Sequence, residues 1–189
     1  MSDFAGQFRD FFERVANGTV EIYNEISLQH ELGIHLRSSI GPRFKVQFER
    51  PATFFGVTKG DLEKKEIDIS IFTPDRSVKH AIELKYPRNG QYPEQMFKAC
   101  QDIRFVEQLS RNGFGRSFFI FVADDPGFYS TANRADGIYE HFRGSKPIHG
   151  LIQKPTGHRD HTIEILGRYQ IVWCAAISQL RYAVLEIGA

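Results

Sequence analysis

The sequence has little cysteine, and its two cysteines lack the spacing of a metal or redox motif. Cys100 and Cys174 stand in apolar surroundings without a CxxC partner, which argues against a disulfide framework and predicts buried thiols in a reducing, cytoplasmic compartment. Long hydrophobic runs are also lacking, because the longest, residues 171–177, is far short of the ~18–20 residues that cross a bilayer. With nothing that resembles a signal peptide, we expect a soluble protein without a membrane partner.

An excess of one charge is lacking as well, since 24 Lys and Arg residues face 23 Asp and Glu residues. A nearly neutral chain has no overall field that attracts a polyanion, so any surface for nucleic acid must be local. The sequence has no internal repeat, low-complexity tract or long block of like charge. At 189 residues, 41% of them hydrophobic, residues 1–189 are expected to form one domain.

What the sequence does contain is a predicted β-hairpin that carries charge in its arms. Residues 66–72 and 80–86 both alternate with a period of two, and residues 73–77 between them are rich in turn formers. If the turn is centred between residues 75 and 76, Asp68 lies across from Glu83 on one face. Carboxylates that face each other at roughly 4.5–5.5 Å between Cβ atoms repel, so the pair needs a proton or a cation. A divalent metal ion is the obvious candidate.

Lys85 follows Glu83 by two positions and is therefore expected on the same face as the two carboxylates. A register slip of two residues would preserve this arrangement, and only a slip of one would separate the three side chains. The same register places Ser70 across from Ala81. The hairpin is thus predicted to gather two acids and one lysine on one surface.

Helices are predicted before the hairpin. One amphipathic helix is expected over residues 3–16 and another over residues 19–38, followed by a strand over residues 44–50 and a loop. In the second helix, Glu25 points along the apolar stripe, whereas Glu31 lies at its edge. Either acid could join the hairpin carboxylates. The alternative is that Glu31 is a boundary residue and Glu25 an ordinary surface acid.

A second group of elements is predicted after the hairpin. A loop leads to a helix over residues 94–109 and then to an apolar strand over residues 116–122. Charged side chains at four-residue spacing run along this helix: Glu94, Lys98 and Asp102. We interpret them as a solvated ladder, with a role facing the site as the alternative. A short helical turn near residues 138–142 and two or three further strands, including residues 169–177, should follow.

Together these elements predict an α/β protein with a central mixed β-sheet flanked by helices and a C-terminal antiparallel extension. The core is expected over about residues 19–122, and about residues 123–189 form a C-terminal embellishment. The order of elements, with Asp68 on one strand and Glu83-Leu84-Lys85 on the next, resembles the PD-(D/E)XK nuclease superfamily. Its fold is the restriction-endonuclease-like α/β/α sandwich. The resemblance covers about residues 23–122, with Ile67 where the motif has proline.

The resemblance implies a metal-dependent nuclease in which Asp68, Glu83 and Lys85 are catalytic. The helical acid of many members falls on Glu31 if judged by distance to the next strand, or on Glu25 if judged by the apolar stripe. Mg²⁺, with Mn²⁺ as a substitute, suits this set because it prefers oxygen ligands and needs only one or two carboxylates beside a substrate phosphate. Its expected ligands are Asp68, Glu83, the Leu84 backbone carbonyl and Glu31.

The expected substrate is nucleic acid, with DNA ahead of RNA, and a homodimer is an open alternative to a monomer. Polar side chains near the predicted lysine strand could contact phosphates or bases. They are Arg88, Asn89, Gln91, Lys98 and Arg104. The alternative function is a catalytically inactive module on the same fold that binds nucleic acid or protein, with the Asp68, Glu83 and Lys85 cluster as a salt-bridge network.

Overall fold

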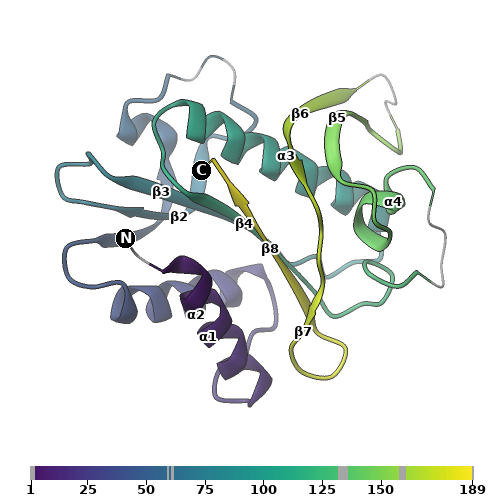
Figure 1. Cartoon of the computed structure of the whole chain (residues 1–189), viewed down its shortest axis with the longest axis horizontal. Coiled ribbons are helices and arrows are strands. Elements are labelled where there is room, and N and C mark those ends of the chain that lie inside the picture. Colours follow the sequence, from purple (N-terminus) through teal and green to yellow (C-terminus); the bar gives the residue numbers. More distant parts are fainter. Residues whose placement is uncertain (1–2, 59, 61, 132–135, 158–160, 189) are drawn as a thin grey trace.

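A computed structural model of the chain describes residues 3–58, 60, 62–131, 136–157 and 161–188. Its strands are β1 (Lys45–Pro51), β2 (Glu66–Phe72), β3 (Lys79–Lys85), β4 (Ser117–Ala123), β5 (Ile148–Gln153), β6 (Thr162–Tyr169), β7 (Cys174–Ala175) and β8 (Arg181–Ile187). Six of them form one sheet in the order β1-β2-β3-β4-β8-β7, and β5 pairs with β6 in a second sheet (Figure 1). Strands β3 and β4 run parallel, and the other neighbours are antiparallel. The predicted α/β class with a mixed central sheet is therefore confirmed.

Helices cover both faces of the central sheet. Helices α1 (Phe4–Ala16) and α2 (Glu25–Ser39) lie on one face, and α3 (Tyr92–Arg111), α4 (Tyr139–Arg143) and the β5–β6 sheet lie on the other (Figure 1). Because side chains alternate along a strand, Phe118 and Ile120 of β4 pack towards α1 and α2, whereas Phe119 and Phe121 pack towards α3. Strand β4 is buried on both faces, as its continuous apolar sequence predicted.

The predicted hairpin register is confirmed. Ser70 pairs with Ala81, and the ladder between β2 and β3 runs from Ile69 opposite Ile82 to Phe72 opposite Lys79. The segment before the hairpin, predicted as a loop, also contains a 3-10 helix, η1 (Ala52–Phe55).

Helix α2 begins at Glu25, so the predicted start at residue 19 is wrong. The Asn24 side chain accepts a hydrogen bond from the Ser27 amide at 2.7 Å, while the Ser27 hydroxyl accepts one from the Asn24 amide at 3.0 Å. This reciprocal cap fixes the helix start. Val20 and Ile22 are both buried and stand two positions apart, as in an extended segment that packs one side on the core.

The C-terminal part departs from prediction in detail. Strand β8 pairs antiparallel with β4 and extends the sheet as expected. Residues 169–177 were predicted as one strand, but within them only the short edge strand β7 joins the central sheet. Cys174 on this edge is exposed, so its predicted burial is wrong, whereas Cys100 is buried. Strand β5 was not predicted because Gly150, at φ +73°, interrupts its alternation with a bulge. Within the described ranges, no helix is long and apolar enough to span a membrane.

His80 links the stability of this fold to pH. Its ring lies 5.0 Å from the Phe4 ring centroid, and its Nδ1 lies 2.8 Å from the Arg116 carbonyl oxygen. Burial lowers the pKa of His80 below its ordinary value of 6.5, despite the hydrogen bond to Arg116, so the folded protein favours the neutral ring. Its contribution to the free energy of unfolding is complete above pH 6.5 and is lost as the pH falls from there through the lower folded pKa.

Wild type should therefore lose more stability between pH 8 and pH 5 than His80→Gln does, as measured by urea unfolding at a series of pH values. His30→Gln is the matched control, because the His30 side chain is 65% exposed, and it should keep the wild-type pH dependence. Parallel pH curves for wild type and His80→Gln would contradict the linkage.

Candidate active site

The candidate site lies where the β2–β3 ladder ends. Beyond the pair Ile69 and Ile82, side-chain carboxylates replace backbone carbonyls as hydrogen-bond acceptors. The Asp68 amide donates to Glu83 Oε1 at 3.2 Å, and the Leu84 amide donates to Asp68 Oδ2 at 2.8 Å. The two acids predicted to face each other are thus held together by the backbone of the opposite strand.

Lys64 sits between these two acids. Its Nζ lies 3.3 Å from Asp68 Oδ1 and also forms an ion pair with Glu83 Oε2. Glu83 is fully buried, whereas the Lys64 side chain is 31% exposed. Two like charges on adjacent strands are costly without a compensating cation, and here an ammonium group supplies it.

Lys85 connects the hairpin to helix α2. Its Nζ lies 3.2 Å from Glu25 Oε2, and the Tyr86 amide donates to the same carboxylate at 2.9 Å. Glu25 is the first residue of α2, so the helix start carries it to the end of β3. Of the two helical acids left open by the sequence, the structure therefore brings Glu25 to the cluster. Glu31, a predicted metal ligand, lies elsewhere, with its carboxylate 3.6 Å from His30 and its side chain 36% exposed.

Asp102 completes the cluster. It comes from α3, which lies on the face of the sheet opposite α2. Its Oδ1 lies 3.4 Å from Lys64 Nζ, and its Oδ2 lies 3.6 Å from Lys85 Nζ. The residue is only 5% exposed, so its interpretation as part of a solvated ladder is wrong. The signal was present in the sequence, because Asp102 stands three positions after buried Ala99 and four before buried Val106.

Burial dominates the electrostatics of the cluster. It raises the pKa of Asp68 to about 6, although Lys64 and the Leu84 amide act in the opposite direction. Burial, followed by the charge of Asp68, raises the pKa of Glu83 well above its ordinary range, and burial also raises the pKa of Asp102. For Lys64, burial alone would lower the pKa, but Glu83, Asp102 and Asp68 outweigh it and raise the pKa. Each of the three acids therefore releases its proton at a higher pH than an exposed carboxylic acid would.

The donor atoms fit a hard divalent cation. Asp68 and Glu83 offer carboxylate oxygens, and Mg²⁺ needs one or two of these beside water and phosphate. Asp102 Oδ2 is buried and accepts no hydrogen bond from the described part of the chain. Among the described residues, no three His, Cys, Asp or Glu side chains are already arranged to hold a metal ion. The carboxylates are instead spaced around the ammonium group of Lys64.

Comparison with known proteins adds no relative. A scan against protein-family models, a search of curated proteins and a search of solved structures each found no match to this chain.

The residues predicted to contact substrate lie at several separate places. Arg88 forms an ion pair with Asp124 and lies over the Tyr86 ring, 5.2 Å from its centroid. Asn89, Gln91 and Lys98 are exposed at the start and on the outside of α3. Arg104 lies apart from the acids, because its Nη1 is 3.5 Å from Glu107 Oε2 on the side of α3 that faces β6.

Gln29, like Lys64, was not singled out from the sequence, whereas Asp102 was named with a role facing the site only as the alternative. Its Nε2 donates to the Asp68 carbonyl at 2.8 Å and to Glu49 Oε1 at 2.5 Å, so it ties α2 to the strand that carries the first acid. Gln29 stands one helical turn after Glu25, which places both on the face of α2 that meets the sheet edge. That spacing is the signal that could have found it.

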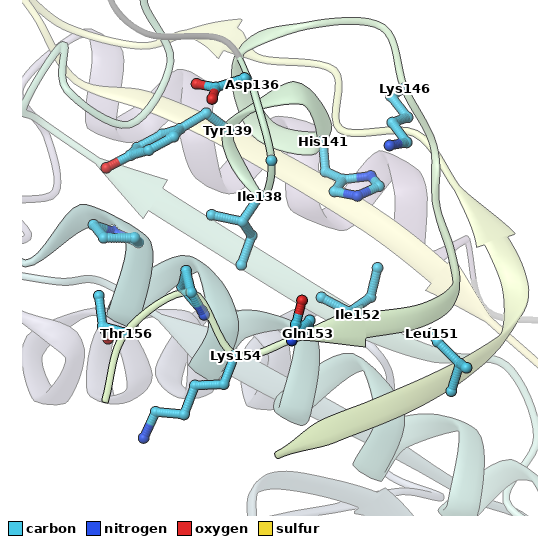
Figure 2. Close-up of a pocket in the computed structure, with 13 residues that line it drawn as sticks. Asp136, Ile138, Tyr139, His141, Lys146, Leu151, Ile152, Gln153, Lys154 and Thr156 are labelled. Carbon is cyan, nitrogen blue, oxygen red and sulfur yellow. The ribbon is translucent and has the colours of Figure 1, made fainter. Parts of the chain in front are cut away.

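Two hollows lie near these elements. One, of about 400 Å³, is lined by Lys64 and Asp68 together with Glu49, Glu63, Lys65 and Glu66, and it gives solvent access to the acid cluster. The other, of about 520 Å³, lies between the α4 region, β5 and the start of α3 (Figure 2). Its Lys154 pairs with Glu94 at 3.2 Å and its Lys146 with Glu140 at 3.0 Å. Of the described residues that line this second cavity, Asp136 is the one acid, whereas three carboxylates converge at the acid cluster, which is therefore the better candidate site.

Proposed function

We propose that this protein is a divalent-metal-dependent nuclease that hydrolyses phosphodiester bonds in nucleic acid, with DNA as the first substrate to test and RNA as the second. The observation that carries the proposal is the meeting of Asp68, Glu83 and Lys85 with Glu25 at one end of the sheet. This combination, on a mixed sheet with helices on both faces, also supports the restriction-endonuclease-like fold of the PD-(D/E)XK superfamily.

Each residue of the cluster has a role in this proposal. Asp68 and Glu83 would hold Mg²⁺ or Mn²⁺, with the Leu84 carbonyl as a further ligand. The ion would supply Lewis acidity towards the scissile phosphate and a water of lowered pKa. Burial alone would lower the pKa of Lys85, but Asp102 and Glu25 raise it, so the amine stays charged. Lys85 therefore stabilises negative charge on the phosphate and does not act as a base.

A non-catalytic module is the second candidate, and a specific observation favours it. Lys64 already pairs with Asp68 and Glu83, and Lys85 with Glu25, so the cluster could be a buried salt-bridge network that only fixes the packing of the helices on the sheet. Such a module would bind nucleic acid or protein without cleaving it. The two candidates differ in whether the acids bind a metal ion.

The deciding experiment combines metal binding with cleavage. Millimolar Mg²⁺ or Mn²⁺ should raise the melting temperature of wild type, because an ion that binds only the folded state stabilises it, and Asp68→Ala should lose this rise. Wild type should also cleave at least one member of a panel of single-stranded, duplex and branched DNA and RNA. A metal-dependent rise in melting temperature without cleavage of any member would favour the binding module. No rise in the melting temperature of wild type would contradict the metal site.

A further inference from the structure

The ammonium group of Lys64 occupies the point where three carboxylates from three different elements converge. Asp68 comes from β2, Glu83 from β3 and Asp102 from α3. Such a point is where a cation is bound most strongly, because the attractions of all three acids add. Lys64 comes from the connection between η1 and β2 and not from a rigid element.

The two lysines of the cluster are attached differently. Lys85 stands at the end of a central strand, is 14% exposed, and is held between Glu25 and Asp102. Lys64 has a flexible four-carbon stem and is 31% exposed at the hollow of about 400 Å³. The neighbouring Glu63 amide donates to Gln108 Oε1 at 2.9 Å, which fixes the backbone beside it. The Lys64 ammonium can therefore leave the acids by side-chain rotation alone.

Distances explain why the acids do not yet form a metal site. Lys64 Nζ lies 3.3 Å from Asp68 Oδ1 and 3.4 Å from Asp102 Oδ1, whereas Mg²⁺ requires oxygen ligands at about 2.0–2.1 Å. The acids must draw inwards once the ammonium group has left. Replacing a single positive charge by a double one also compensates more of the charge on the four carboxylates of the cluster, including Glu25.

We propose that Lys64 marks the divalent-cation position, that the ion and the Lys64 ammonium occupy it in exchange for one another, and that Asp102 joins Asp68 and Glu83 as the third ligand. This inference rests on the proposed metal-dependent function and deepens it. Without the ion, Lys64 keeps the acids paired and the fold intact. With the ion, the released ammonium group lies in the hollow, which the structure shows is open to solvent at this side chain.

The test uses acetylation of lysines in the full-length wild-type protein, read by mass spectrometry with and without Mn²⁺. Lys64 should become several-fold more reactive at Mn²⁺ concentrations where calorimetry shows the ion bound, because its amine moves from three carboxylates into water. Lys146, which is 56% exposed and pairs with Glu140, is the internal control and should react equally in both states. This readout needs no variant and so does not depend on a mutant that folds.

Two variants complete the test by calorimetry. Lys64→Met should bind Mn²⁺ at least about fivefold more tightly, because the competing ammonium group is gone. Asp102→Asn should bind it roughly tenfold more weakly. Unchanged labelling of Lys64 with Mn²⁺ bound would overturn the exchange but leave the metal-dependent function standing, and unchanged affinity in Asp102→Asn would overturn the third ligand. No Mn²⁺ binding by wild type and Lys64→Met alike would overturn the proposed function itself.

Discussion

In Mg²⁺, the Lys85→Met variant is expected to cleave nucleic acid at least about 100-fold more slowly than wild type. In the proposed function, Lys85 stabilises the charge that develops on the phosphate, and methionine keeps the length of the side chain without its charge. The rate is measured under single-turnover conditions, so that product release does not hide the chemical step. Lys146→Met, at a paired and distant lysine, should leave the rate unchanged.

The two helical acids sharpen this prediction. Glu25→Gln weakens the ion pair that positions Lys85, at 3.2 Å, and should slow cleavage by about tenfold or more. Glu31→Gln makes the same chemical change six positions along the same helix, outside the cluster, and should have no effect. Melting temperatures of both variants show whether a loss of rate reflects a loss of fold. Equal rates for Glu25→Gln and wild type would contradict the role of Glu25 in positioning the lysine.

The strand part of the cluster could be predicted because a strand has a strict side-chain period. Once the turn fixed the register at Ser70 opposite Ala81, the positions of Asp68 and Glu83 followed from parity alone. The period of a helix is less decisive, since Glu25 and Glu31 both lie near the apolar stripe. The structure separates them by a feature that a helical wheel does not contain, the cap at Asn24 that sets where α2 begins and so carries Glu25 to the end of β3.

Lys64 and Asp102 could not be placed by the same reasoning. Lys64 lies in an irregular connection, where no period relates sequence to direction. Asp102 lies on a helix whose spacing with Lys98 imitates a solvated ladder, and its burial depends on how α3 packs over β3. Local residue preferences determine where the helices and strands form. The packing of α2 and α3 on opposite faces of the sheet determines which charged side chains meet.

Glu107→Ala is expected to be strongly destabilising, by about 3–5 kcal/mol. Glu107 is 6% exposed, and its carboxylate accepts hydrogen bonds from the Leu166 amide at 3.1 Å and the Gly167 amide at 2.6 Å. It also accepts one from the Tyr169 hydroxyl at 3.1 Å. Alanine would leave these partly buried donors and the nearby Arg104 without their acceptor, and an unsatisfied polar group costs up to about 1–3 kcal/mol when it is buried.

The loss of stability should begin where α3 meets β6, because the Glu107 carboxylate joins these two elements by hydrogen bonds. Urea unfolding gives its size, and hydrogen exchange of the Leu166 and Gly167 amides should be faster in Glu107→Ala well before global unfolding. Glu94→Ala is the matched control on the same helix. Its side chain is 25% exposed and pairs with Lys154, so its loss should cost no more than about 1 kcal/mol. Equal losses in the free energy of unfolding for Glu107→Ala and Glu94→Ala would contradict this prediction. They would indicate that water replaces the Glu107 carboxylate and that apolar packing holds β6 to α3.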